Sequence, residues 1–360
     1  MGTRCDRYVI VELDGSGHRF WYVSLLIHWL VDNVVLPDIS LITTHLAQGR
    51  PEWDEFMGAN LHASRLNVVL VEDPRATMDA IATLQREEMA RLVITDGDRW
   101  LARLVTAMVI HGLKPRGSIL IMRPYRAPGI RGAVRHFTKL AVMTSIDVLT
   151  RDFRVLKLAP NGSRVSDLSW VNDPVEFHPR EVARQAWYEP HGLAVDHKYL
   201  VVLGDLSRRK YVLDLVAAFD LQLVDNWHLV LVGKLGDEER DYFAKHSAPT
   251  RVSVFEGFIS DEDFDTWIAQ ADAVAVLYRN EGASGVLGKC AVAGVPVLVG
   301  GTKSVLDSAR LLDLPRSEIS RVDAARICEA LTYLPRRGAM APHLSLRAGS
   351  EDFASRLLRR

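Results

Sequence analysis

One segment in the second half of the chain combines an acidic residue, a flexible turn and a lysine. It reads EGASGVLGKCAVAGVPVLVGG and covers residues 281–301. Glu281 precedes a Gly/Ser turn, and Ser284 can cap a helix that begins at Gly285 and carries Lys289. The first amides of such a helix have no intrahelical acceptor, so they can bind a phosphate while Glu281 accepts hydrogen bonds from hydroxyls beside it. The pattern indicates a site for a phosphate next to a polyol, and it equally fits a capped helix behind an exposed acid.

A second segment places several cations where an apolar run gives way to a helical one. In LGDLSRRKYVLDLVAAF, residues 203–219, the cations are Arg208, Arg209 and Lys210, which follow Ser207. Guanidinium groups and a lysine ammonium both stabilise phosphoryl oxygens. A basic helix start opposes the helix dipole, so helix stability does not explain it. We interpret this segment as a contact for a diphosphate.

Both segments belong to a regular alternation of apolar runs and helical stretches. Buried strands are predicted at residues 7–13, 66–72, 91–96, 118–124 and 154–159, and again at 198–204, 227–233, 252–257, 273–278 and 295–300. Continuous apolar runs are typical of parallel strands that are covered on both faces. Two such series predict an α/β fold with two doubly wound, Rossmann-like domains that face each other across a cleft.

The boundary between the two domains is predicted where Pro, Asn and His interrupt both patterns, in residues 169–193. This gives an N-terminal domain over residues 1–180 and a C-terminal domain over 181–345. Residues 346–360 are predicted to form a helix that can cross back to the N-terminal domain.

The second half of the chain resembles the nucleotide-binding domain of retaining GT-B glycosyltransferases of family four, the glycosyl transferases group 1. The resemblance runs in order through GDLSRRK, LVLVGKLGDEERDYF, VSVFEGFISDEDFDTWIAQADAVAVLY and EGASGVLGKCAVAGVPVL. It implies a hexosyltransferase that moves a sugar from a nucleotide diphosphate sugar to a hydroxyl acceptor with retention of the anomeric configuration. The donor would bind the C-terminal domain and the acceptor the N-terminal domain.

The resemblance also implies roles for individual residues. Glu281 matches the acid that holds the hydroxyls of the transferred sugar, and the amides of Ser284 and Gly285 would face the diphosphate. Lys210 matches the lysine that neutralises the diphosphate as it leaves. No protein nucleophile is implied, because the leaving phosphate would itself accept the proton of the acceptor. The protein would act by positioning and by charge stabilisation.

The N-terminal half matches the family mainly in architecture. LDGSGHRFWYV, residues 13–23, stands in place of the glycine-rich first loop of the family, so Gly17 and His18 would lie near the diphosphate and the acceptor. The segment is not a dinucleotide-binding fingerprint, because Phe20 occupies the position of the third glycine. A histidine after such a turn can equally be structural.

Three positions depart from the family pattern. Lys289 stands where a second acid normally binds the ribose, Asp205 where an arginine is usual, and Tyr211 where a glycine follows the lysine. Arg208 and Arg209 can replace the missing arginine. We therefore predict an intact donor-sugar end of the site and an altered nucleoside end. Lys289 would make an unusual ribose contact, bind an extra phosphate, or indicate that no nucleotide binds.

The net charge of −1 hides a strongly basic block. Residues 99–146 carry +9 and contain no Asp or Glu, which leaves −10 on the rest of the chain. Within the block, Arg131, Arg135 and Lys139 recur every fourth residue beside a more apolar stripe that includes Phe137. The pattern predicts contact with an anionic partner, either a phosphorylated acceptor or an acidic membrane surface, and a solvated surface helix would look the same.

The composition of the chain limits where the protein acts and which cofactors it needs. Three scattered cysteines favour a reducing compartment, and no segment has the apolar length of a signal peptide or membrane span. We expect a cytoplasmic protein that at most touches a membrane and has no nucleic-acid partner. Dispersed His and Cys and the lack of a suitable Asp-x-Asp predict no cofactor and no obligatory metal. In VITDGDRW, residues 93–100, Asp98 is expected to cap the following helix rather than to orient an acceptor, and Asp96 lies at the same strand end.

Two alternatives stay open. A nucleotide-sugar epimerase of the same fold would need acid/base residues around the sugar ring, for which Glu281 and His18 are the candidates. A non-catalytic sugar- or nucleotide-binding protein would explain Lys289 and Asp205, whereas Glu281 and Lys210 favour the transferase.

Overall fold

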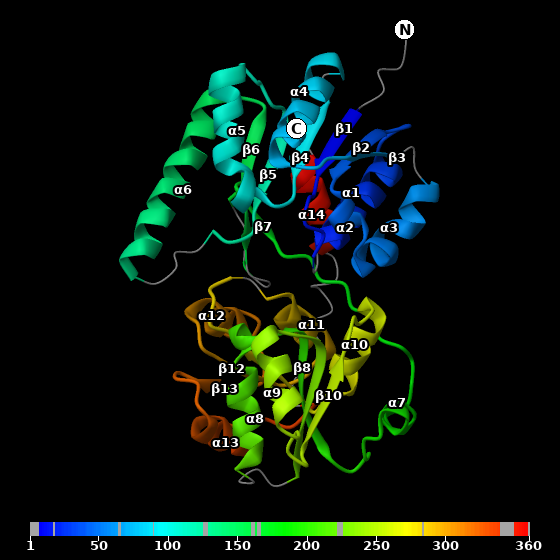
Figure 1. The fold of residues 1–360 in the computed structure, drawn as a ribbon, viewed down its shortest axis with the longest axis vertical. Coiled ribbons are helices and arrows are strands. Elements are labelled where there is room, and N and C mark those ends of the chain that lie inside the picture. Colours follow the sequence, from blue (N-terminus) through cyan, green and yellow to red (C-terminus); the bar gives the residue numbers. More distant parts are fainter. Residues whose placement is uncertain are drawn as a thin grey trace. The chain divides into compact units, whose positions relative to one another are not determined.

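The computed structural model describes residues 7–16, 19–63, 66–88, 90–124, 129–159, 163, 167–221, 226–282, 284–338 and 349–358. The chain forms two compact units (Figure 1). The first comprises residues 1–159, 164–172 and 349–360, and the second comprises residues 160–163 and 173–348. Each unit is a parallel β-sheet with helices on both faces, so the predicted pair of doubly wound α/β domains is confirmed.

The sheet of the first unit has seven strands in the described residues, in the order β3-β2-β1-β4-β5-β6-β7, and every neighbouring pair is parallel. The strands are β1 (Arg7–Val11), β2 (Asp38–Thr43), β3 (Leu66–Leu70), β4 (Arg91–Ile94), β5 (Gly117–Ile121), β6 (Phe153–Ala159) and β7 (Trp170–Asn172). The central strands are almost fully buried, as their continuous apolar runs require.

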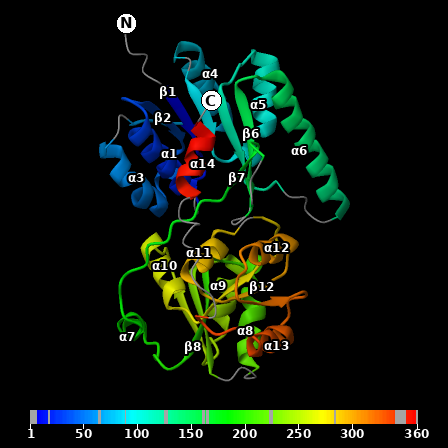
Figure 2. The same cartoon turned by 180° about the vertical axis from the view of Figure 1, so that it is seen from behind.

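Helices cover both faces of this sheet. On one face lie α4 (Pro74–Glu88), α5 (Gly97–His111) and α6 (Gly129–Leu149), which supply Ile81, Leu104 and Ile146 to one core cluster. On the other face lie α1 (Arg19–Asn33), the short α2 (His45–Gln48), α3 (Pro51–Ala63) and α14 (Gly349–Leu358), seen from behind in Figure 2. The two layers enclose the strands of the sheet.

The helix α14 belongs to the first unit although it follows the whole second unit in sequence. It packs against α1, β5 and β7. Three side chains of the sheet bond to its last carbonyls: Arg91 to Leu358 O, Ser118 to Leu357 O and Arg154 to Arg356 O, each at 2.7 Å. These bonds satisfy carbonyls that a helix C-terminus leaves unpaired.

The sheet of the second unit has six strands in the described residues, in the order β10-β9-β8-β11-β12-β13, again all parallel. The strands are β8 (Lys198–Leu206), β9 (Trp227–Leu235), β10 (Val252–Glu256), β11 (Ala273–Leu277), β12 (Val297–Gly300) and β13 (Arg316–Ile319). One core cluster joins the sheet to α8 (Val212–Asp220), α9 (Asp237–Lys245) and α13 (Ala324–Thr332). The other joins it to α7 (Arg184–Tyr188), α10 (Asp261–Gln270), α11 (Gly285–Ala293) and α12 (Lys303–Leu311).

Three strands of the structure are missed by the sequence pattern: β2, β7 and β13. In β2, DISLIT, and in β13, RSEI, polar residues interrupt the apolar run on which the prediction depends. The strand β7 has only three residues, too few to show a pattern. Hydrogen bonds to an already formed sheet specify these strands more than their own composition does.

Each sheet reverses the direction in which the chain adds strands. The first sheet grows from β1 to β2 and β3 and restarts on the other side of β1 with β4. The second grows from β8 to β9 and β10 and restarts on the other side of β8 with β11. The crevice beyond the carboxyl ends of the strands at such a reversal is the usual place for a ligand. Side chains that bind a ligand are therefore expected after β8 and β11, and after β1 and β4.

Candidate active site

The cations predicted to bind a diphosphate follow directly after β8. Arg208–Lys210 form one turn of 3₁₀ helix, in which Lys210 N donates to Ser207 O at 2.7 Å. The turn directs the ammonium of Lys210 back into the unit, where Nζ donates to Leu203 O. The side chain is buried, and burial together with the charge of Arg209 lowers the pKa of Lys210 to about 7. Lys210 is thus a proton-exchanging group near neutral pH, which an anionic ligand would hold in its charged form.

Tyr278 connects this turn to the second predicted segment. It follows β11, and its buried ring lies 5.1 Å from the guanidinium carbon of Arg209 and 5.9 Å from Nζ of Lys210. Its phenolic oxygen accepts a hydrogen bond of 3.3 Å from Oγ of Ser284. Sequence reasoning places Tyr278 in a strand and assigns it no role. The one available signal is an aromatic residue at a strand's carboxyl end, just before the acidic turn.

Ser284 occupies the N-cap position of α11, as predicted, but its hydroxyl makes no bond to the helix. The bond to Tyr278 takes its place. Gly285 and Val286 lie in the first turn of α11. Their N–H groups therefore have no intrahelical acceptor, because no helical turn precedes them. The backbone of this turn can therefore receive an anion, and Lys210 and Arg209 are the cations linked to it through Tyr278.

Glu281 is anchored to the start of the next helix. Its Oε2 accepts the N–H of Ser304, in the first turn of α12, at 2.9 Å, and the N–H of Gly282 donates to Oγ of Ser304 at 3.0 Å. A carboxylate at a helix N-terminus is stabilised by the helix dipole. This arrangement fixes Glu281 between the carboxyl ends of β11 and β12, and among the described residues no hydrogen bond is made to Oε1.

Lys289 forms buried ion pairs in the second unit. Its Nζ lies 2.6 Å from Oδ1 of Asp265 and 3.1 Å from Oδ1 of Asp261, both on α10. Asp265 is buried as well, and burial raises its pKa to about 6 although Lys289 opposes the change. The other oxygen of Asp265 accepts the N–H of His178 at 2.7 Å. Lys289 therefore helps to hold α11, α10 and the segment that enters the second unit.

Tyr211, where the resembling family has a glycine, adopts a left-handed backbone with φ of 55°. This conformation is unfavourable for a residue with a Cβ. The guanidinium carbon of Arg279 stacks 4.0 Å from the centre of the Tyr211 ring, and Arg279 Nε also donates to Arg208 O at 2.9 Å. The stacked ring offsets part of the cost of the backbone and ties the turn after β8 to the residue that follows Tyr278.

Asp205 and the two arginines lie at the outer edge of this site. Asp205 is exposed, and its Oδ2 lies 3.8 Å from Arg209 and accepts a hydrogen bond of 3.3 Å from Ser207 Oγ. Arg208 is exposed, and its carbonyl accepts hydrogen bonds from Nε of Arg279 at 2.9 Å and from the N–H of Tyr211 at 3.3 Å. The guanidinium group of Arg208 is therefore exposed at the carboxyl ends of β8 and β11, and that of Arg209 is half-buried beside it.

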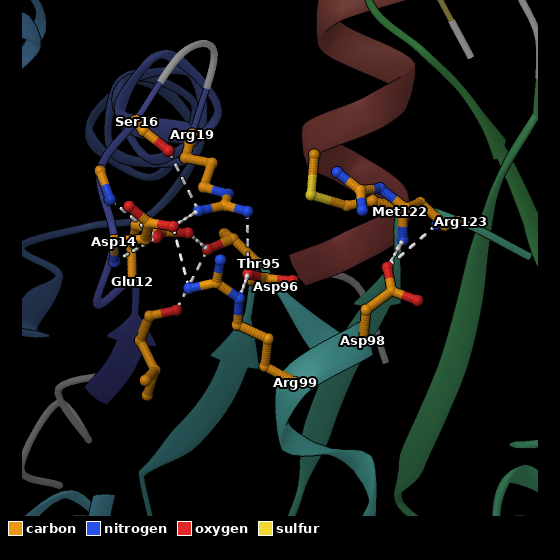
Figure 3. A network of polar contacts seen from close by, with 12 residues as sticks. Glu12, Asp14, Ser16, Arg19, Thr95, Asp96, Asp98, Arg99, Met122 and Arg123 are labelled. Atoms are coloured by element: carbon orange, nitrogen blue, oxygen red, sulfur yellow. Dashed lines mark hydrogen bonds and ion pairs between the residues drawn. The ribbon is translucent and has the colours of Figure 1, made fainter. Parts of the chain in front are cut away.

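The reversal between β1 and β4 in the first unit carries a second polar cluster, shown in Figure 3. Glu12 is fully buried, accepts the N–H groups of Asp14 and Gly15 at 2.9 and 3.1 Å, and accepts the hydroxyl of Thr95 at 2.7 Å. Burial raises the pKa of Glu12, opposed by the Thr95 hydrogen bond and the charge of Arg19. Glu12 thus fixes the start of the loop that was predicted to contact the diphosphate.

Arg19 and Arg99 complete the cluster by bridging two carboxylates. Arg19 pairs with Asp14, and its other terminal nitrogen lies 3.1 Å from Asp96. Arg99, from α5, lies 2.9 Å from Asp14 and 3.3 Å from Asp96 (Figure 3). Burial would raise the pKa of Asp14, but the hydrogen bond and charge of Arg19 outweigh it, so the pKa lies below its usual value. For Asp96, burial wins and the pKa is raised.

The expected helix cap at Asp98 is wrong. The helix α5 begins at Gly97, and Asp98 lies inside its first turn, with Asp96 at the cap position. Oδ2 of Asp98 accepts the N–H groups of Met122 and Arg123 at 2.9 and 3.0 Å (Figure 3), and its Oδ1 pairs with Lys139. Asp98 therefore joins the loop after β5 to α5, a long-range contact that a local capping pattern cannot reveal.

The three cations predicted as an anion patch on α6 have different surroundings. Lys139 points toward the body of the unit, where Nζ pairs with Asp98 and donates to Arg123 O at 2.7 Å. Arg135 is exposed. The side chain of Arg131, like Gly17 and His18, lies outside the described residues. Only Arg135 is thus seen to be available to an anion.

In the part of the chain that the structure describes, no group of three or more His, Cys, Asp or Glu is arranged to hold a metal ion. Across the same residues, no helix is both long and apolar enough to cross a membrane.

Comparisons with known proteins bear on both units. The family model described as glycosyl transferases group 1 matches residues 183–310. Over 98% of this chain and 95% of the other, the fold is similar to sucrose-phosphate synthase from Thermosynechococcus elongatus, with a TM-score of 0.65 and 15% identity. With a TM-score of 0.62 and 12% identity over the same shares, it is similar to HepE from Anabaena, solved in complex with UDP and glucose.

A third solved structure has a different assigned activity. A Listeria monocytogenes protein assigned as a UDP-N-acetylglucosamine 2-epimerase matches with a TM-score of 0.58 and 12% identity, over 97% of this chain and 91% of that one. A search of curated protein sequences found no match. The structural matches establish the fold, and the family model confirms the predicted resemblance of the second half of the chain to the glycosyl transferases group 1. Residues 183–310 thus match the model of the glycosyl transferases group 1, within a chain that has the two-domain GT-B fold.

Proposed function

We propose that the protein is a retaining glycosyltransferase, which moves a sugar from a nucleotide diphosphate sugar to a hydroxyl acceptor. One observation carries the proposal: Tyr278 brings the cationic turn after β8 and the open first turn of α11 together at the reversal of the second sheet. The cations of this turn and the free amides of α11 together suit a diphosphate. Glu281, which accepts the N–H of Ser304 in α12, lies between the carboxyl ends of β11 and β12.

In the proposed complex, each of these groups has a distinct task. The amides of Gly285 and Val286 and the side chains of Arg208 and Arg209 bind the diphosphate. Oε1 of Glu281 accepts hydrogen bonds from sugar hydroxyls, while Oε2 keeps its bond to the helix α12. The division fixes the sugar relative to its leaving group.

The reaction needs no protein nucleophile. The bond between the anomeric carbon and the donor phosphate oxygen breaks, and the acceptor oxygen bonds to the same face of that carbon. The acceptor's proton passes to the departing phosphate oxygen. Lys210 stabilises the charge that develops on the diphosphate, because its ammonium is held in a buried position by the Leu203 carbonyl. We propose no obligatory metal for this step.

Lys289 takes a supporting part in this proposal. It was predicted as a donor contact, but to reach a ligand it would have to leave its ion pairs with Asp261 and Asp265. We propose that it positions α11, whose first turn receives the diphosphate, and that Asp261, the more exposed of the two acids, lies nearest to the nucleoside.

The first experiment is a thermal-shift and calorimetric titration of the full chain with UDP, GDP, ADP, TDP and their common sugar conjugates. A ligand at a hundred times its Kd adds about 2.7 kcal/mol, enough to raise the Tm by a few degrees. The proposal expects one nucleoside diphosphate to stand out and Arg209→Gln to weaken it. Arg321→Gln, which alters an exposed arginine after β13, is the control. No shift with any nucleotide would contradict the proposal.

Proton NMR of the bound donor then separates the reaction classes. A transferase releases the sugar, by slow hydrolysis if no acceptor is present, and the first product keeps the donor's anomeric configuration. An epimerase instead changes the sugar while it stays attached to the nucleotide. A binding protein leaves the donor intact. Only the first outcome supports the proposed activity.

A further inference from the structure

The helix α6 exposes apolar side chains on the side that faces away from its sheet. Four large apolar residues on that side are at least 59% exposed: Ile130, Val134, Phe137 and Val148. Their spacings of four, three and eleven residues place them on one side of an α-helix. The opposite side buries Met143 and Ile146 in the core. The helix is therefore apolar on two sides, of which this unit covers one.

The neighbouring helix α5 adds to the same surface. Val109 and Ile110, near its end, are 67% and 68% exposed. Because α5 and α6 cover the same face of the sheet, their outer surfaces form one side of the unit. At 1.5 Å per residue α6 is about 31 Å long, and its N-terminal half runs past α5 in both ribbon views (Figures 1 and 2). We call the exposed side chains of these two helices the α5–α6 face.

Cations outnumber acids around this face. Residues 99–146 contain no Asp or Glu, and six of their described cations are exposed: Arg99, Arg103, Lys114, Arg116, Arg123 and Arg135. Of these, Arg99 pairs with Asp14 and Asp96, and Arg116 lies 3.6 Å from Asp152. The acid that precedes the block, Asp98, is paired with Lys139. Asp147 is exposed next to Val148, at the C-terminal end of α6. The face is thus apolar and cationic over most of its length, and most strongly so in the N-terminal half of α6.

We propose that the α5–α6 face binds the surface of an anionic lipid bilayer. The side chains of Ile130, Val134 and Phe137 enter the boundary between headgroups and acyl chains, and Arg135 binds lipid phosphates beside them. Such a helix lies in the plane of the surface and does not need the length of a membrane span.

Charge complementarity favours a bilayer over a second copy of the chain. Two copies joined through this face would bring the exposed cations of both copies together, among them Arg103, Lys114 and Arg135, and these cations would repel each other. An acidic bilayer supplies the opposite charge and a continuous apolar layer. Membrane binding is independent of the donor site, so its test can fail while the transferase proposal stands.

Co-sedimentation of the full chain with vesicles tests the proposal. One set of vesicles contains phosphatidylcholine alone and the other also contains phosphatidylglycerol. Binding should be stronger to the anionic set and should weaken with added salt, because surface charge is screened. Arg135→Gln should weaken binding about fivefold, the equivalent of ~1 kcal/mol for one cation at the surface. Arg336→Gln, an exposed arginine of the second unit, is its charge-matched control.

The apolar contribution has its own pair of variants. Phe137→Asp should weaken binding to anionic vesicles at least about tenfold, since it removes an inserting ring and adds a repelled charge. Leu46→Asp makes a comparable change at a residue that is 76% exposed on α2, and should leave binding unchanged. Circular dichroism checks folding, and Ile130→Asp replaces Phe137→Asp if that variant fails to fold.

Three results would overturn the proposal. The first is binding that is absent or equal for the two kinds of vesicle. The second is binding that Phe137→Asp and Ile130→Asp leave intact. The third is a dimer at micromolar concentration that Phe137→Asp dissociates, which would make the face an interface between copies of the chain.

Discussion

The ammonium of Lys289 lies 2.6 Å from the carboxylate of Asp265, and both side chains are buried. The two residues lie on neighbouring helices, α11 and α10. The second carboxylate oxygen of Asp265, Oδ2, accepts the backbone N–H of His178. One buried carboxylate thereby links the helix of the anion-binding turn to the segment that enters the second unit. A change at Lys289 should therefore be felt at His178, although the two residues are 111 positions apart in sequence.

Lys289→Met should destabilise the second unit by about 3–5 kcal/mol, because it leaves the charge of Asp265 buried without a partner. Hydrogen–deuterium exchange should show faster exchange in α10 and around His178. The double variant Lys289→Met/Asp265→Leu should recover much of the loss. Lys245→Met, at an exposed lysine of α9, is the control. If the single variant were as stable as the wild type, the ion pair would have no structural part.

The pKa of Lys210 predicts a pH dependence of stability. The folded-state pKa, about 7, lies below the ordinary value of 10.5, so the unfolded chain binds the proton more tightly. Stability from this group must therefore rise as pH increases from about 7 to about 10, with a slope of at most ~1.4 kcal/mol per pH unit. Urea denaturation at several pH values should show a steeper rise for the wild type than for Lys210→Met. Parallel curves would contradict the depressed pKa.

Glu281 should separate a structural from a functional contribution. Glu281→Gln keeps an oxygen that can accept the N–H of Ser304, so the Tm should change little. Glu281→Ala removes this cap and should cost about 1 kcal/mol. Both variants should lose most of the donor turnover, because neither presents a carboxylate to the sugar. A Glu281→Gln enzyme with normal turnover and normal stability would confine Glu281 to capping α12.

Tyr211 allows the strain of its backbone to be measured. Tyr211→Ala keeps the left-handed backbone and loses the stacking with Arg279, whereas Tyr211→Gly relieves the backbone as it loses the ring. The glycine variant should therefore be more stable than the alanine variant by about 1 kcal/mol. Thermal unfolding of the two variants, compared with the wild type, gives this difference directly. An alanine variant as stable as the glycine variant would argue against strain at this turn.

The sequence was a good guide to the sheets because buried parallel strands leave continuous apolar runs. It also located the two segments after β8 and β11, since cations and a Gly/Ser turn stand out against such runs. It could not find the partners of these residues. The acids that neutralise Lys289, Asp265 and Asp261, lie 24 and 28 positions away in sequence, and Thr95 meets Glu12 over 83 positions.

The error at Asp98 has the same origin. A carboxylate near the start of a helix predicts an N-cap. The carboxylate oxygens of Asp98 instead accept the N–H groups of Met122 and Arg123 and pair with Lys139. The contacts of Tyr278 were not predicted, because they join it to the hydroxyl of Ser284 and to the cations Arg209 and Lys210, which come from separate segments. Local patterns indicate which chemistry a residue offers, and tertiary structure decides which neighbour uses it.

The placement of α14 sets an order for the folding of the nascent chain. Residues 173–348 are all synthesised before residues 349–358, so the second unit can fold while the first still lacks the helix that covers β5 and β7. Until then, Arg91, Ser118 and Arg154 have not met the carbonyls of α14 to which they bond. The unit that the ribosome starts first is therefore the last to be completed, and an alteration at the C-terminal helix would act on the N-terminal sheet.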